Sequence, residues 1–183
     1  MHYQIRVSGF GGQGIILAGY IIGKGASIYD RSNVSFTQSY GPEARGGACS
    51  SQVIISSEEI DYPHVTDPDA VIIMSQAAYA RYGKNLKPGT FLLTDSDLVK
   101  VDPEDLVNIK HFSIQATKFS EDLGKKIVAN IVMLGFFTGI TEMVSREGML
   151  KAIESTVPSK MFDINKTAFE KGLQEAEKAK VAV

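Results

Sequence analysis

The sequence is poor in the residues that bind metals and form covalent cross-links. Its 183 residues include one cysteine, Cys49, no tryptophan and three histidines. A structural disulfide, a thiolate zinc site and an iron–sulfur cluster each need more than one thiolate. The histidines, His2, His64 and His111, are scattered and form no HExxH-type motif. We therefore predict no metal site in this chain and assign these histidines a surface or structural role.

The sequence also lacks a large charge of either sign. Lysine and arginine number 19, aspartate and glutamate number 21, and the formal net charge is −2. A general nucleic-acid-binding protein needs a basic excess to contact phosphates. Residues 127–141 are uncharged but shorter than the roughly 20 residues that cross a bilayer, and they contain Asn130. We expect no membrane span, and a helix here that is buried either in the core or at an interface with another chain.

Alternating strands and helices predict an α/β fold. The length suits one domain, placed at residues 1–183, and the first residues predict a strand rather than a signal peptide, which favours a cytoplasmic location. Strands are predicted at residues 3–9, 33–39, 50–57, 69–75, 90–96 and 109–114. Helices are predicted at residues 14–29, 76–84, 115–124, 126–143, 146–155 and 165–180. This order indicates a three-layer Rossmann-like domain, with a mainly parallel sheet and helices on both faces. The last helix is expected on the sheet layer, and residues 55–69 are expected to form an irregular loop.

The first glycine motif, "GFGGQG" at residues 9–14, follows the first predicted strand and precedes a helix. Glycines in such a turn let the backbone approach a phosphate, and the amides at the helix start point toward it. A tight turn without a ligand is the alternative. A nicotinamide site would also need an acidic residue at the end of the second strand. Asp30 comes before that strand and Glu43 beyond it, so the ribose contact is missing.

A second motif, "SYGPEARGG" at residues 39–47, combines a Gly-Pro turn with an arginine beside two glycines. Arg45 in this setting suits bidentate binding of a phosphate or a carboxylate. An internal salt bridge, with Glu43 as the partner, explains the same residues equally well.

The segments "GFGGQGIILAG", "QSYGPEARGG" and "SSQVIISSEEIDYP" together closely resemble the gamma subunit of 2-oxoacid:ferredoxin oxidoreductases, nearest to the 2-oxoglutarate type. The segments "DAVIIMSQAAYARY", "GTFLLTDSDLV", "NIVMLGFFTGIT" and "FDINKTAFEKGL" extend the resemblance over essentially the whole chain. The resemblance implies an α/β subunit that helps to close the active site and contributes to coenzyme A binding. It also implies a complex that converts a 2-oxoacid and coenzyme A to an acyl-CoA, succinyl-CoA for 2-oxoglutarate, and carbon dioxide.

The resemblance assigns the remaining cofactors to other chains. Thiamine diphosphate with Mg²⁺ and the iron–sulfur clusters belong to the alpha, beta and ferredoxin-like delta subunits, and electrons pass to ferredoxin. This sequence has no Gly-Asp-Gly…Asn signature for thiamine diphosphate and no Gly-x-Ser-x-Gly elbow. Cys49 is best explained as a small buried thiol. We therefore predict no catalytic residue in this chain. We expect the chain to be one component of a larger enzyme, and a homodimer is possible when it is isolated.

The predicted cofactor-binding residues lie in the two glycine motifs. They are Gly9, Gly11, Gly12, Gln13, Gly14, Tyr40, Arg45, Gly46 and Gly47. The first motif is expected to face a phosphate-bearing ligand or the active-site mouth, and Arg45 to contact an anion. Three alternatives remain open: a gamma-type subunit acting on pyruvate or indolepyruvate, a free-standing oxidoreductase that binds a nucleotide, and a scaffold whose loops contact only protein.

Overall fold

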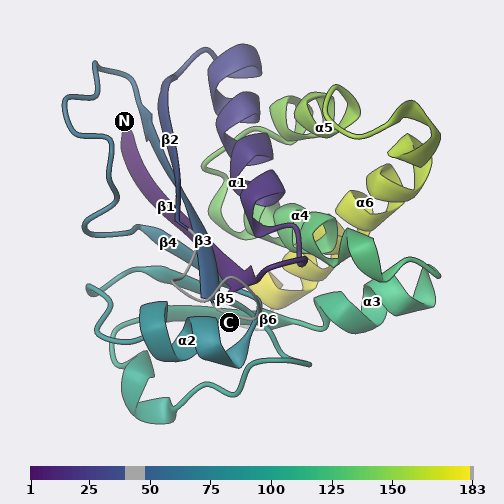
Figure 1. Cartoon of the computed structure of the whole chain (residues 1–183). Helices are drawn as coiled ribbons and strands as arrows, with labels where there is room; N and C mark the ends of the chain where they lie inside the picture. Colours follow the sequence, from purple (N-terminus) through teal and green to yellow (C-terminus); the bar gives the residue numbers. More distant parts are fainter. Residues whose placement is uncertain (40–47, 182–183) are drawn as a thin grey trace.

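A computed structural model of the chain describes residues 1–39 and 48–181 (Figure 1). The strands are β1 (His2–Phe10), β2 (Asn33–Ser39), β3 (Ala48–Ser56), β4 (Ala70–Ile73), β5 (Phe91–Asp95) and β6 (Lys110–Ile114). The helices are α1 (Ile15–Lys24), α2 (Gln76–Tyr82), α3 (Ala116–Asp122), α4 (Ala129–Thr141), α5 (Arg146–Glu154) and α6 (Phe162–Val181). Shorter helical turns are η1 (Gly25–Tyr29), η2 (Pro103–Leu106), η3 (Lys126–Val128) and η4 (Ser159–Met161).

The six strands form one sheet in the order β2-β3-β1-β4-β5-β6. The pairs β1–β4, β4–β5 and β5–β6 are parallel, whereas β3 is antiparallel to both of its neighbours. The predicted mainly parallel sheet is therefore confirmed, with β3 as the reversed strand. The reversal has a simple cause: only residues 40–47 join β2 to β3, and a parallel crossover needs about a dozen residues or more.

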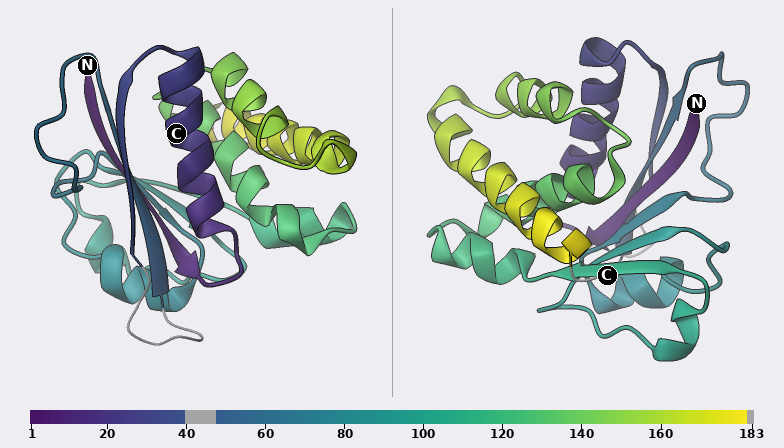
Figure 2. Two further views of the ribbon diagram at one scale, coloured as in Figure 1. Left: turned by 45° about the horizontal axis from the view of Figure 1, so that its top comes forward. Right: turned by 180° about the vertical axis from the view of Figure 1, so that it is seen from behind.

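Helices cover both faces of the sheet, as predicted (Figures 1 and 2). On one face, Ile5, Val7 and Ile72 pack in the main core with α1 and α4. On the other face, Val71 and Ile73 pack with α2 in a smaller cluster. Successive residues of a strand point to opposite faces, so the continuous apolar sequence of β4 is what a strand buried on both sides requires.

Helix α4 lies in the core of this chain. Ten of its residues are buried, and α6 packs along it. The two backbones approach closely, because a Cβ atom at Gly135 would overlap the carbonyl oxygen of Phe169, and one at Gly172 would overlap that of Val132. The core alternative for residues 127–141 therefore holds, although Ile127 just before α4 is 72% exposed. The expectation that the last helix lies on the sheet was wrong, since α6 packs against α4 instead.

The other element boundaries differ only slightly from the predictions. The helix predicted at residues 14–29 is α1 followed by the π-helical turn η1, and the strand predicted at 50–57 begins two residues earlier. Gly19 of α1 faces Ser51 of β3, where a Cβ atom would overlap the serine hydroxyl. Close approach of helix and sheet thus accounts for that glycine. Within residues 1–39 and 48–181, no helix has the length and apolar character that a bilayer crossing requires.

Tyr79 of α2 gives a prediction about alkaline pH. Burial, followed by its hydrogen bond to Asp105, raises the pKa of the Tyr79 hydroxyl to about 12. The folded state holds this proton more tightly than the unfolded state, whose tyrosine titrates near 10. The resulting stabilisation is complete below pH 10 and is lost as the pH rises toward 12. Spectroscopic titration of tyrosinate should show a late step that disappears in Tyr79→Phe; a wild-type protein without that step would contradict this assignment.

Candidate functional site

The two glycine motifs are attached to the same edge of the sheet. This edge contains the carboxyl ends of β1, β4, β5 and β6, where ligands bind in open α/β sheets. Phe10, at the end of β1, pairs with Ala48, the first residue of β3, and Ser39 at the end of β2 pairs with Ser50. The residues that flank both motifs are therefore neighbours across adjacent strands.

The second motif itself is outside the described residues. Four predicted site residues fall there: Tyr40, Arg45, Gly46 and Gly47. Their assignment stays a prediction from the sequence.

The first motif adopts a conformation that needs its glycines. Gly12 has φ +95° and Gly14 has φ +72°, in the left-handed region where side chains are strained. Gly14 directly precedes α1, and its carbonyl accepts the amide of Ala18 at 2.8 Å. A Cβ at Gly9 would overlap Gln13 and Ile15, whereas one at Gly11 would have no atom of residues 1–39 or 48–181 within 4 Å. Gly11 is thus the position of the motif where a side chain fits without displacing a neighbour.

Gln13 holds this loop to the neighbouring strand. Its Oε1 accepts the amide of Phe10 at 2.6 Å, and its Nε2 donates to the carbonyl of Met74, just beyond β4, at 2.7 Å. Both ends of the side-chain amide are therefore used within the chain. The geometry gives Gln13 a positioning role, and its contact with a ligand stays a prediction.

The loop presents free backbone donors at the start of α1. Among residues 1–39 and 48–181, the amides of Gly11, Gly12 and Gly14 find no hydrogen-bond acceptor, and no side chain caps α1. The first amides of a helix have no acceptor within the helix, and the helix dipole makes this end positive. Together these groups favour an anion, above all a phosphate.

A hollow of about 400 Å³ adjoins the glycine loop at Gly12 and Gln13. Its lining residues are Gly12, Gln13, Met74, Leu98, Thr117, Lys126, Ile127 and Ala129. The Thr117 hydroxyl donates to Asp95 at 2.6 Å, which leaves the lining mostly apolar. Lys126 is an exposed cation that pairs with Glu121 at 2.8 Å. The hollow therefore suits an apolar chain, with an anion bound at the glycine loop or near Lys126.

Asp95 anchors the wall of this hollow. It is fully buried at the end of β5, and its carboxylate accepts the amide and hydroxyl of Thr117 and the amide of Asp97. Burial raises the pKa of Asp95, and the three donors oppose that shift. Asp95 thus fixes the start of α3 and keeps the Thr117 hydroxyl occupied.

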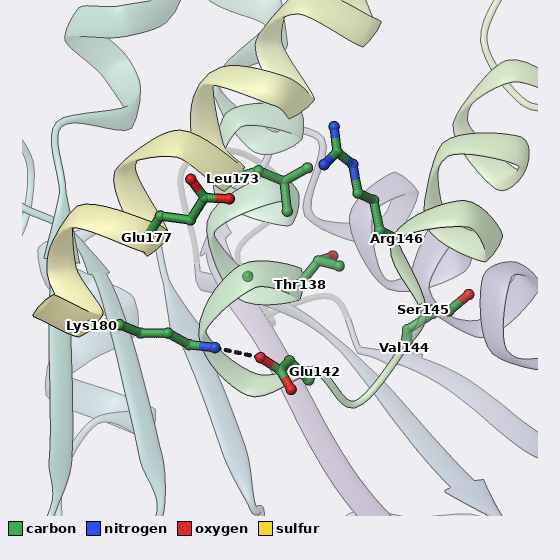
Figure 3. A pocket seen from close by; sticks show the side chains of 9 residues that line it. Thr138, Glu142, Val144, Ser145, Arg146, Leu173, Glu177 and Lys180 are labelled. Carbon is green, nitrogen blue, oxygen red and sulfur yellow. Dashed lines mark hydrogen bonds and ion pairs between the residues drawn. The ribbon is translucent and has the colours of Figure 1, made fainter.

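A second cavity, of about 280 Å³, lies between the ends of α4 and α6 and the start of α5 (Figure 3). Glu142 and Lys180 form an exposed ion pair across it, and Arg146 and Glu177 also line it. It shares no lining residue with the hollow at the glycine loop. Its balanced, solvent-exposed charges indicate no chemistry.

The reactive side chains have structural surroundings. Cys49 is a buried free thiol, as expected, and burial raises its pKa, so little thiolate forms at neutral pH. His111 lies 2.9 Å from the Thr94 hydroxyl, and burial lowers its pKa. In the part of the chain that the structure describes, no three His, Cys, Asp or Glu side chains gather as a metal site would require.

Asn130 was noted in the sequence but not assigned to the site. It is the second residue of α4, and its Nδ2 donates to the carbonyl of Gly14 at 3.2 Å. This contact joins residues 116 positions apart, so no local pattern reveals it. Asn165 lies inside α6, where its Nδ2 donates to the carbonyl of Met161. Met74, Thr117 and Ile127 were also missed, because only the fold brings them to the hollow.

Comparisons with known proteins show which family the chain belongs to. Residues 4–175 match the family model described as pyruvate ferredoxin/flavodoxin oxidoreductase. The chain is 49% identical over 177 residues to 2-oxoglutarate synthase subunit KorC of Methanocaldococcus jannaschii, covering 96% of this chain and 95% of that subunit.

Two solved structures share the fold. The gamma subunit of a keto/oxoacid ferredoxin oxidoreductase from Geobacter sulfurreducens is 44% identical to this chain, with a TM-score of 0.85. The match covers 97% of this chain and 99% of that subunit. The 2-oxoglutarate:ferredoxin oxidoreductase of Magnetococcus marinus, solved with 2-oxoglutarate, coenzyme A and succinyl-CoA bound, is 25% identical with a TM-score of 0.85. That match covers 97% of this chain and 31% of the longer one. The chain therefore belongs to the pyruvate ferredoxin/flavodoxin oxidoreductase family, as a gamma-type subunit.

Proposed function

We propose that the chain is the gamma subunit of a 2-oxoglutarate:ferredoxin oxidoreductase and supports the oxidative decarboxylation of 2-oxoglutarate to succinyl-CoA. The similarity to the KorC subunit extends over nearly the full length of both chains, which favours 2-oxoglutarate over pyruvate or indolepyruvate. In this proposal residues 1–183 act as one domain, in the cytoplasm.

The chain's own contribution is to coenzyme A binding and to the active-site mouth. The observation that carries this proposal is a loop whose Gly11, Gly12 and Gly14 amides find no acceptor among the described residues, and which adjoins a mostly apolar hollow at Gly12. Coenzyme A combines phosphates, which suit helix-terminal amides, with a long arm, which suits an apolar channel. Gly9 and Gln13 shape the loop, and Tyr40, Arg45, Gly46 and Gly47 complete the proposed site from the second motif.

The redox chemistry belongs to partner chains. A four-thiolate cluster does not fit a chain with one cysteine that is buried, and we route no step of the reaction through such a group here. The Magnetococcus relative carries the same fold within a chain about three times as long, which supports association with other parts. We propose alpha, beta and ferredoxin-like delta subunits as partners, with thiamine diphosphate, Mg²⁺ and the iron–sulfur clusters bound there and ferredoxin as the acceptor.

Reconstitution tests this function. The chain is co-expressed with the proposed alpha, beta and delta subunits, and turnover is measured with coenzyme A, ferredoxin and each of three oxoacids. We expect turnover with 2-oxoglutarate at least about tenfold above that with pyruvate or indolepyruvate, a difference of about 1.4 kcal/mol in transition-state binding. Omission of the chain should abolish acyl-CoA formation. Higher turnover with another oxoacid would contradict the assignment of 2-oxoglutarate as the substrate. Micromolar binding of NAD(H) or FMN by the chain alone would favour a free-standing oxidoreductase.

A further inference from the structure

Asn130 is a buried polar side chain that joins helix α4 to the glycine loop. It is 2% exposed, at the first turn of α4, and its side chain touches Gly14 rather than its own helix. The missing Cβ of Gly14 leaves the space that the Asn130 amide occupies, since a Cβ there would overlap Nδ2. The two residues are therefore complementary: Gly14 has a left-handed conformation and no side chain, and the Asn130 amide occupies the space that a side chain at position 14 would take.

The bond from Asn130 controls the direction of one peptide group. The Gly14 carbonyl accepts both Asn130 Nδ2 at 3.2 Å and the amide of Ala18 at 2.8 Å. In a planar trans peptide the C=O and the following N–H point in opposite directions. Holding the Gly14 oxygen toward α4 and into α1 therefore aims the Ile15 amide out of the helix end, toward the carboxyl edge of the sheet. Without this bond, the Gly14–Ile15 peptide is held only by the first turn of α1.

The other end of the Asn130 amide costs stability. Among the described residues, its Oδ1 is buried with no hydrogen-bond donor. A buried acceptor without a partner is unfavourable, and an apolar side chain of the same shape removes that cost. Core packing alone would favour leucine at this position. An asparagine at this position therefore indicates a role for its donor, Nδ2, and within the described residues that donor bonds only to the glycine loop.

We propose that Asn130 is a positioning residue for coenzyme A, which fixes the Gly14–Ile15 peptide so that the amides at the start of α1 meet a phosphate group. This inference rests on the proposed function of the glycine loop. Asn130 contacts no ligand in this role; it acts through Gly14. Its position on α4 also ties the loop to the most deeply buried helix of the chain, so the donor geometry is set before the ligand arrives.

The test compares Asn130→Leu with Asn165→Leu in the assembled complex. Both asparagines are buried and donate Nδ2 to a backbone carbonyl, but Asn165 bonds to Met161 of its own turn. We expect Asn130→Leu to raise the KM for coenzyme A about tenfold, the loss of one well-aimed bond to a charged group, with kcat nearly unchanged. The isolated Asn130→Leu chain should melt at or above the wild-type temperature. Asn165→Leu should leave the KM for coenzyme A unchanged.

A third variant separates this inference from the proposed function. Gly11→Asp places a carboxylate in the glycine loop, where no described residue lies within 4 Å of the new Cβ. If Gly11→Asp raises the KM for coenzyme A and Asn130→Leu does not, the positioning role is wrong while the site stands. If neither variant changes that KM, the site itself is wrong. Should the leucine variant fail to fold, Asn130→Ser, whose side chain is too short to reach Gly14, provides the same comparison.

Discussion

Gly172→Ala should destabilise the isolated chain by about 3 kcal/mol, the upper range for forcing one extra carbon into a packed core. A Cβ at Gly172 would overlap the carbonyl oxygen of Val132 and crowd the backbone of Phe136. These are backbone atoms within α4, so no side-chain rotation relieves the overlap, and α6 must move away. Urea denaturation of the two proteins measures the difference in the free energy of unfolding.

Gly23→Ala is the matched control. Gly23 is also a buried helical glycine, but its nearest neighbour is a methyl group of Val34 at 3.3 Å, which can yield slightly. Alanine also favours a helix over glycine, by about 1 kcal/mol. The control should therefore stay within about 1 kcal/mol of the wild type. Equal losses in both variants would show that α4 and α6 do not pack through their backbones.

The sheet was predictable because its evidence is local. β4 and β5 are short apolar segments, and such segments identify strands buried on both faces directly. β1 instead alternates apolar and polar residues, which is the pattern of a strand. The direction of β3 was also available from the sequence, since residues 40–47 are too few for a parallel crossover. The placement of α6 was not, because an apolar helix face does not say whether a sheet or another helix covers it.

The candidate site was predictable in part for the same reason. The glycines of residues 9–14 predict a turn with residues in the left-handed conformation, and Gly12 and Gly14 have that conformation. The contacts that hold the turn are long-range: Gln13 to Met74 spans 61 positions. They depend on β1 pairing with β4, which no single segment encodes. The hollow is invisible in the sequence because its lining comes from several separate elements.

A negative charge introduced at position 11 should have the largest effect of a single substitution on the activity of the assembled enzyme. Gly11 lies in the glycine loop and its φ is not positive. Among the described residues, nothing lies within 4 Å of the place that a Cβ would take, so these residues accommodate a short side chain. A carboxylate there competes for the free amides and repels a phosphate. At roughly 5 Å and an effective dielectric constant near 20, that repulsion is about 3 kcal/mol per pair of unit charges. Salt should weaken it, since exposed charges are screened.

The comparison of Gly11→Asp with Gly11→Asn in the assembled enzyme tests the central claim most directly, because the two side chains share a shape and differ in charge. We predict that Gly11→Asp raises the KM for coenzyme A at least about tenfold above that of Gly11→Asn, the effect of 1.4 kcal/mol, while the KM for 2-oxoglutarate stays the same in both. Equal KM values for coenzyme A in the two variants would contradict a phosphate-binding role for the glycine loop.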